Sequence, residues 1–334
     1  MWGLAPQTEE ASDLTVPLPH TEHPPDQAFP TYATRVTTLK NGLQVASADH
    51  NLPAATVGLY LHTGSAYEQI SGTTHLLKHM AFKQSANYSQ VSAFRALESI
   101  GAMPAVTPGR EACVYQLDTV REAVPHAVAL LADTVLAPKF LPWEIDEAKL
   151  LVKEELDDAK KNPQGIVQEL TNTAAYGGAS PLGAPLFVPP RNLPHLDGDV
   201  LSRFVHAEYV PSRMVLTCVG ADHEDLVALA ETHFGSLEGG APQKEVAAAY
   251  EGGEVRESSE DDLCHVGIAF KGCSWNSKDL VPVCVLNTLM GGGASFSAGG
   301  PGKGMYTRLY QNVLNRSVVQ AASVYSSFYN GCGT

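Results

Sequence analysis

The chain has 334 residues, of which 44% are hydrophobic and 17% are charged, and its formal net charge is -14 at pH 7. This length favours two globular domains with a sizeable core, and the negative charge argues against nucleic acid and anionic membranes and favours a basic partner or substrate. No apolar run approaches the roughly 20 residues of a membrane-spanning helix. No two of the six cysteines form a C-x-x-C pair, so we expect reduced or buried thiols.

Residues 1–33 are rich in proline and acidic side chains and contain neither lysine nor arginine. We therefore expect an acidic, irregular N-terminal arm. A mitochondrial transit peptide is rich in arginine and poor in acidic residues, so this arm does not read as one. If the protein is organellar, we expect its targeting segment to be absent from this sequence or already removed.

Residues 34–238 are predicted to form a first domain of the α+β class. A hairpin over 34–49 is indicated by Asn41-Gly42 between alternating apolar residues. Hydrophobic periodicity predicts further strands at 54–62, 113–119 and 214–219, and helices at 73–82, 91–100, 122–136, 142–161, 165–176, 199–209 and 224–234. The proline-rich residues 181–196 are predicted to be irregular. Because the elements show no regular β-α-β alternation, α+β fits better than a doubly wound sheet.

Residues 239–253 contain glycine, alanine and proline and are predicted to be a linker. Beyond them the order of elements starts again, with a strand at 264–270 and a helix at 280–290. We therefore expect residues 254–334 to begin a second, related domain that is incomplete in this chain.

The glycine-rich loop at residues 291–304 is the most informative local feature, because half of its residues are glycine. Glycine gives up chain entropy and offers no side chain to pack, so a domain tolerates such a run where backbone must move or approach something closely. Phe296 is its only large apolar side chain, and a further helix is predicted after it, at 305–314. Neither the Walker pattern nor G-x-G-x-x-G fits the spacing. A flexible linker remains the alternative.

His75 and His79 stand at i and i+4, on one face of a predicted helix. That spacing can hold zinc. In the inverted zinc-peptidase motif H-x-x-E-H, the glutamate is the general base that activates the metal-bound water. Here Lys78 occupies that position, and an ammonium group accepts no proton at pH 7. The alternative, two histidines on a partly buried helix without metal, is the expectation we adopt.

The predicted helix at 142–161 carries seven acidic residues: Glu144, Asp146, Glu147, Glu154, Glu155, Asp157 and Asp158. Such a run is usually a solvated face. A surface that attracts basic peptides is the functional alternative.

The chain resembles the inverzincin, or pitrilysin-type, peptidases, and within them the branch of mitochondrial processing peptidase α-subunits. Glu155 follows the histidine pair at the spacing of the family's third zinc ligand. The other matching stretches are 37–43, 72–77, 80–83, 100–102, 212–216, 289–293 and 295–305. The resemblance covers about residues 34–334 and is strongest to the plant-type subunit, which is also a core subunit of respiratory complex III.

The resemblance implies two related α+β domains, each a mostly antiparallel sheet flanked by helices. It also implies a zinc-bearing, catalytic β-subunit as the partner in a heterodimer, and basic mitochondrial presequences as the peptides that the glycine-rich loop captures. The loop positions that match are Gly291, Gly292, Gly293, Ser295, Phe296, Ser297, Gly299, Gly300, Gly302, Lys303 and Gly304. We expect no catalytic residue and no metal in this chain, with His75, His79 and Glu155 as a degenerate zinc site.

Three functions stay open from the sequence. The first is a non-catalytic subunit in the mitochondrial matrix, on the inner membrane, that recognises presequences and presents them to the β-subunit, while built into complex III. The second is a purely structural core subunit of complex III on the matrix side. The third is an active zinc metalloendopeptidase, which Lys78 disfavours because losing a general base costs about 10²–10⁴-fold in rate.

Overall fold

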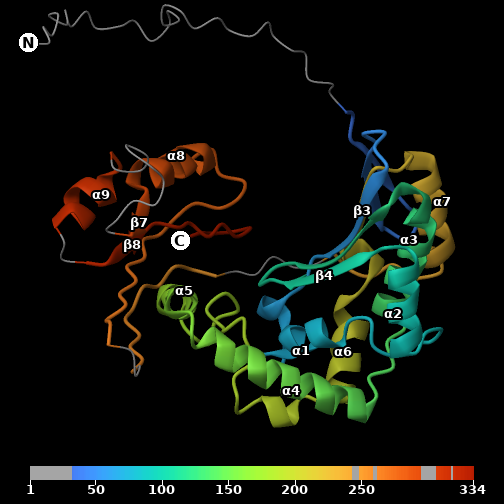
Figure 1. The fold of residues 1–334 in the computed structure, drawn as a ribbon, viewed down its shortest axis with the longest axis horizontal. Helices are drawn as coiled ribbons and strands as arrows, with labels where there is room; N and C mark the ends of the chain where they lie inside the picture. Colours follow the sequence, from blue (N-terminus) through green and yellow to red (C-terminus); the bar gives the residue numbers. More distant parts are fainter. Residues whose placement is uncertain (1–31, 243–247, 259–261, 295–305, 317–318) are drawn as a thin grey trace, which may run out of the picture. The chain divides into compact units, whose positions relative to one another are not determined.

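The computed structural model describes residues 32–242, 248–258, 262–294, 306–316 and 319–334 (Figure 1). The chain divides into two units, Met1–Ala33 and Thr34–Thr334. Only Tyr32 and Ala33 of the first unit are described, so the predicted acidic arm lies almost wholly outside the described residues.

Residues 35–219 contribute a six-stranded sheet, in the strand order β1-β2-β6-β3-β5-β4. Its strands are β1 (Arg35–Thr38), β2 (Gln44–Ala48), β3 (Ala54–Leu61), β4 (Met103–Pro108), β5 (Cys113–Val120) and β6 (Met214–Val219). Neighbouring strands are antiparallel except for β2 and β6, which run parallel. The sheet is therefore mixed but mostly antiparallel, as predicted.

One face of the sheet is buried and the other is partly exposed. Along β5, Cys113, Tyr115 and Leu117 are buried, whereas the alternate side chains are half-buried or exposed. Strand β6 alternates in the same way, which is the period-two pattern expected when only one face packs against helices.

The helices of residues 73–234 are α1 (Thr73–Met80), α2 (Gln90–Ser99), α3 (Val124–Leu136), α4 (Pro142–Ala159), α5 (Pro163–Tyr176), α6 (Gly198–Glu208) and α7 (His223–Phe234). Helices α1, α3 and α7 contact the sheet, whereas α4, α5 and α6 contact other helices. Short 3₁₀ turns lie at Ser65–Tyr67, Arg121–Ala123, Leu193–His195, Pro211–Arg213 and Leu314–Arg316. Helix α3 packs against β3, β5 and α7, while α1 packs against β4, α4 and α6. Figure 1 shows α1 between the sheet and α4, which is the arrangement that builds the candidate site.

The C-terminal part contains α8 (Leu280–Met290), β7 (Gly292–Ala294), α9 (Arg308–Asn312) and β8 (Ala321–Ser323), with β7 and β8 paired antiparallel. Its last residues pack against α5. Tyr329 and Cys332 share a small buried cluster with Ala175 and Tyr176, and the Tyr329 hydroxyl lies 3.3 Å from Asn172 Oδ1. Both parts thus combine strands and helices, which confirms the α+β class.

Two differences between the predicted and observed strands have a clear physical reason. Residues 264–270 form no strand: no described strand pairs with them, and Val266, Ile268 and Phe270 are exposed. A strand needs a hydrogen-bonded neighbour, and alternation alone does not supply one. Conversely, β4 was not predicted, because its sequence contains two prolines. It is an edge strand, the one place in a sheet where proline is tolerated.

None of the described helices is both long and apolar enough to cross a membrane. All six cysteines are described as free thiols, and Cys113, Cys218 and Cys332 are buried.

Gly72 precedes α1 at a point where the chain touches a distant segment. Its φ is +100°, and a Cβ added there would lie 2.6 Å from the Cα of Val188. The start of α1 therefore packs directly against residue 188, and both the left-handed backbone and the close approach require glycine. Gly101 also has a positive φ, +60°, but a Cβ there would meet nothing within 4 Å.

We predict that Gly72→Ala lowers the free energy of unfolding by about 2–4 kcal/mol. This is the cost of placing alanine in the left-handed region plus the cost of overpacking the contact with Val188. The matched control Gly101→Ala removes only the conformational freedom and is expected to cost about 1–2 kcal/mol. Urea unfolding of both variants measures the difference. Equal losses would show that the contact between Gly72 and Val188 contributes nothing.

Candidate functional site

Helix α1 places three of the sequence-predicted site residues, and its N-terminus is fixed by a carboxylate. Glu68 accepts hydrogen bonds at 2.6 Å from the backbone N–H groups of Gly72 and Thr74, and another from the Thr74 hydroxyl. A carboxylate at this position also interacts favourably with the helix dipole. Burial raises the pKa of Glu68, against the opposing effect of these hydrogen bonds. The helix that carries His75, Lys78 and His79 is thereby held at its start.

Glu155, on α4, meets all three of these side chains. Lys78 Nζ donates to Glu155 Oε1 at 2.7 Å, and His79 Nε2 lies 2.7 Å from Glu155 Oε2. His75 Nε2 is 3.3 Å from the same Oε2. The structure therefore brings together the residues that the sequence proposed as a degenerate zinc site, with Glu155 at their centre and Lys78 bonded to it.

The charge of Glu155 is stabilised by its neighbours. Burial acts to raise its pKa, but hydrogen bonds from Lys78 and His79 outweigh burial and lower the pKa to about 2. Glu155 is therefore an ionised acceptor at neutral pH, paired with a lysine whose side chain is about one-third exposed. The cluster is an ion pair extended by an imidazole.

His75 is the buried member of the cluster, with 2% of its side chain exposed. Burial lowers its pKa, and the pull of Glu155 opposes this shift, so the ring is neutral at neutral pH. The backbone N–H of Val188 donates to His75 Nδ1 at 3.2 Å. The ring of Phe187 packs edge-on against His75 at a centroid distance of 5.2 Å. One residue pair from a distant loop thus fixes this imidazole.

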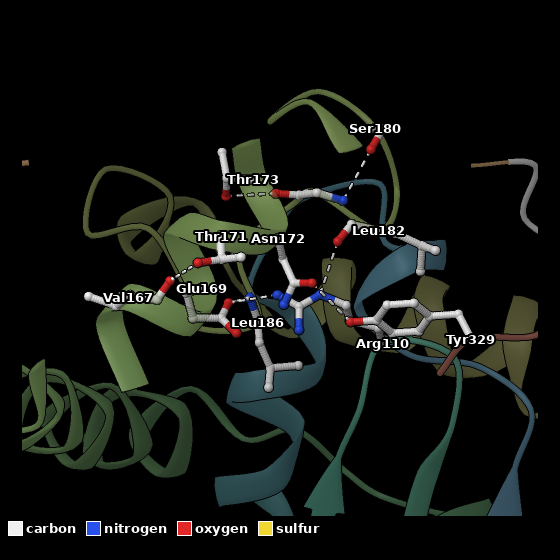
Figure 2. A network of polar contacts seen from close by, with 11 residues as sticks. Arg110, Val167, Glu169, Thr171, Asn172, Thr173, Ser180, Leu182, Leu186 and Tyr329 are labelled. Carbon is white, nitrogen blue, oxygen red and sulfur yellow. Dashed lines mark hydrogen bonds and ion pairs between the residues drawn. The ribbon is translucent and has the colours of Figure 1, made fainter. Parts of the chain in front are cut away.

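The loop that holds His75 is itself anchored by a half-buried ion pair, shown in Figure 2. Arg110 Nη2 lies 2.8 Å from Glu169 Oε2, and its Nε donates to the carbonyl of Leu182 at 3.1 Å. Glu169 Oε2 also accepts the backbone N–H of Leu186 at 2.9 Å. The β4–β5 turn, α5 and residues 182–188 are therefore joined by polar contacts next to His75.

Two histidines and a carboxylate are a ligand set found in catalytic zinc sites. The candidate ligand atoms of His75, His79 and Glu155 lie within 4.8 Å of one another. However, two ligands on a tetrahedral zinc ion stand about 3.3 Å apart, and His79 and Glu155 are in direct hydrogen-bond contact instead. The positively charged Lys78 ammonium donates a hydrogen bond to the other oxygen of the Glu155 carboxylate. The donor types suit zinc, and His75 Nε2, which is buried without a hydrogen-bond partner, stands 3.3 Å from Glu155 Oε2. The close contact of His79 with Glu155 and the charge of Lys78 are the two features that do not fit a bound ion.

The acidic residues of α4 do not form one uniform face. Glu144 is buried and accepts the backbone N–H of Gln84, and Glu147 pairs with Lys83. Asp157 pairs with Lys160, and Asp158 pairs with Lys161 in the same way. Part of the run is therefore structural, and the exposed remainder is consistent with a solvated surface.

The glycine-rich loop is described only at its start. Gly292–Ala294 form β7, so these residues are part of a paired strand, whereas the sequence had indicated a loop. A Cβ at Gly292 would lie 2.7 Å from the carbonyl oxygen of Ala322, which explains a glycine there without a ligand. Residues 295–305, including Phe296 and Lys303, lie outside the described residues.

The sequence did not indicate Glu68, Phe187 or Val188 as site residues. Val188 precedes Pro189-Pro190, and a residue before proline is confined to extended conformations. That signal predicts an extended segment but not which residue faces His75, because the contact spans more than 100 positions of the chain.

Family models match both parts of the chain. The model described as insulinase, peptidase family M16, matches residues 44–190, and the model described as peptidase M16 inactive domain matches residues 195–334. The fold is also similar to a crystal structure of a protease from Helicobacter pylori. The TM-score is 0.72 at 19% identity, covering 90% of this chain and 73% of that one.

Curated relatives are similar in sequence over most of the chain. A probable mitochondrial-processing peptidase subunit alpha-1 of Arabidopsis thaliana is 39% identical, over 96% of this chain and 65% of its own length. The mitochondrial-processing peptidase subunit alpha of Solanum tuberosum is 41% identical over 92% and 62%, and that of Homo sapiens is 35% identical over 85% and 58%. The chain thus spans about 58–65% of the length of these relatives. It belongs to peptidase family M16, and within that family it groups with the mitochondrial-processing peptidase α-subunits.

Proposed function

We propose that this chain acts as the non-catalytic α-subunit of a mitochondrial processing peptidase, which binds basic presequences and presents them to a zinc-bearing β-subunit. The observation that carries the non-catalytic part is the bond between Lys78 Nζ and Glu155 Oε1 at 2.7 Å. Lys78 stands where the inverted zinc motif has its general base, and its ammonium is committed to the carboxylate that would be the third ligand.

The chemistry of that position leaves no route to hydrolysis by this chain alone. When zinc is bound in such a motif it supplies an activated water, and a carboxylate must take the proton from that water. Here Glu155 is already neutralised by Lys78, and the remaining candidate base, His79, is hydrogen-bonded to the same carboxylate. Among the described residues, His75, His79 and Glu155 are the only group of three or more His, Cys, Asp or Glu side chains that could hold a metal ion.

Recognition of presequences is supported by charge and by the relatives. Presequences are arginine-rich and acid-poor, and a chain of net charge -14 attracts such peptides. A loop rich in glycine with one aromatic side chain, Phe296, can close over an amphipathic peptide. The relatives' names supply the mitochondrial location and the subunit role. The matrix-side position within complex III is part of the same proposal.

The two alternative functions left open by the sequence predict different experimental results. A purely structural core subunit of complex III would co-purify with cytochromes and tolerate loop deletion without any change in processing. An active zinc metalloendopeptidase would contain one zinc per chain and cleave presequences alone. The ion pair at Glu155 disfavours the second of these, because a cation beside a metal site repels the metal.

We predict that the purified chain holds well below one zinc ion per molecule and does not cleave a basic presequence peptide. Lys78→Gln removes the positive charge while leaving His75, His79 and Glu155 in place, and should tighten zinc binding at least tenfold. Lys78→Arg keeps the charge and is the matched control, with no gain expected. Zinc content after dialysis and competition with a chelating dye measure both. Stoichiometric zinc with turnover in the unmodified chain would overturn the proposal.

Deleting residues 295–300 tests the loop while sparing β7, whose pairing with β8 the structure shows. In the assembled heterodimer, we predict about tenfold weaker binding of a fluorescent presequence peptide, equivalent to about 1.4 kcal/mol. Replacing the same residues by an equally long Gly-Ser sequence separates the role of Phe296 from that of loop length. Unchanged affinity with intact assembly would favour the structural alternative.

Glu155→Gln tests whether the cluster stabilises the fold. The pKa of Glu155 is lowered to about 2, so its contribution is present above its ordinary pKa near 4.5 and is lost as the pH falls toward 2. We predict a loss of roughly 1–3 kcal/mol at pH 7, discounted for partial exposure. Urea unfolding of both proteins at pH 7 and pH 3 should show the difference shrinking at the lower pH. A constant difference would contradict the ionic role.

A further inference from the structure

When a neutral histidine binds zinc, the protonation state of both ring nitrogens is fixed. The nitrogen that binds the metal must offer its lone pair, so the other nitrogen of the neutral ring carries the proton and donates it to an acceptor such as a carbonyl or carboxylate. A backbone N–H cannot serve as that acceptor.

His75 has the opposite arrangement. Its Nδ1 accepts a hydrogen bond from the backbone N–H of Val188 at 3.2 Å, which places the ring proton on Nε2. Nε2 faces Glu155 Oε2 at 3.3 Å and is the atom that the cluster would offer to a metal. The contact lies in a buried environment, with His75 2% and Val188 1% exposed.

We propose that Val188 is a positioning residue whose backbone N–H holds His75 in the tautomer that cannot bind zinc through Nε2, and that this barrier to metal is independent of Lys78. The inference deepens the proposed non-catalytic function and rests on it. It names a second reason, in the backbone, for the loss of the metal site. A reversion at position 78 alone therefore leaves the site incomplete.

Residues 182–188, which we call the strap, are anchored in a way that keeps the N–H in place. Glu169 accepts the N–H of Leu186, two residues before Val188, and Arg110 holds both Glu169 and the carbonyl of Leu182 (Figure 2). On its other side Val188 packs against Gly72. The strap is thus fixed at its start, near its end and against α1.

Moving the ring proton to Nδ1 would set two N–H groups facing one another in a buried site. Neither would have a partner unless the strap moved, and moving it would break the contacts of Leu186 and Phe187. Loss of a proper partner behind a histidine ligand weakens metal binding about 10–100-fold. We expect the strap to weaken zinc binding by a factor in that range.

The tautomer can be read directly in the full chain by long-range ¹H–¹⁵N correlation spectra with ¹⁵N-labelled histidine. We expect the His75 signals, assigned by their loss in His75→Asn, to show an unprotonated Nδ1 and a protonated Nε2 at neutral pH. A proton on Nδ1 would overturn this inference and leave the proposed function untouched. Zinc found in the unmodified chain would instead contradict the proposed function.

Zinc binding tests the consequence in the Lys78→Gln background. Val188→Pro removes the N–H and keeps the extended backbone that precedes Pro189. The matched control Val188→Ala trims the side chain but keeps the N–H. We expect the proline variant to bind zinc about 10–100-fold more tightly than the alanine variant. Equal affinity in two folded variants would overturn the inference, and if the proline variant fails to fold, the tautomer of the unmodified chain decides.

Discussion

The contact on which the site depends is the ion pair between Lys78 and Glu155. It joins α1 to α4 at the point where a zinc peptidase would hold a metal, and it brings His79 onto the same carboxylate. A metal ion at such a place draws two histidines and a glutamate together by coordination. Here the Lys78 ammonium attracts the carboxylate through one positive charge and a hydrogen bond.

Under the proposed function, this ion pair explains how the fold can keep the shape of the family without its chemistry. The two helices stay in contact, the carboxylate stays ionised, and the buried His75 has a backbone donor on one nitrogen and the carboxylate near the other. Lys78, His79 and Glu155 are therefore joined by hydrogen bonds, whereas His75 Nε2 lies 3.3 Å from the carboxylate without a hydrogen bond to it. A site from which the metal had simply been lost would leave an uncompensated carboxylate in a half-buried position, which is unfavourable.

The sequence was informative where short-range chemistry decides the structure. Asn41-Gly42 marked the first hairpin, and the spacing of His75 and His79 placed both on one helix face. The resemblance to the family also identified Glu155 as their partner, from its distance along the sequence to the two histidines. The sequence failed where a distant neighbour decides the outcome. Prolines masked β4 because only its edge position tolerates them, and residues 264–270 alternate like a strand but have no described strand to pair with. The backbone N–H of Val188 that donates to His75 Nδ1 could not be predicted for the same reason.

The two parts of the proposed function rest on different properties of the molecule. The proposed loss of catalysis follows from a local arrangement of a few side chains on α1 and α4, and it does not depend on the glycine-rich loop. Attraction of basic peptides follows from the net charge of the whole chain, which acts over distances near the Debye length of about 8–10 Å and is weakened by salt. Under the proposed function, a lysine in place of a metal leaves that long-range field in place, since the change is confined to one ion pair. Recognition of basic peptides would then be independent of catalysis, as a division of labour between two subunits requires.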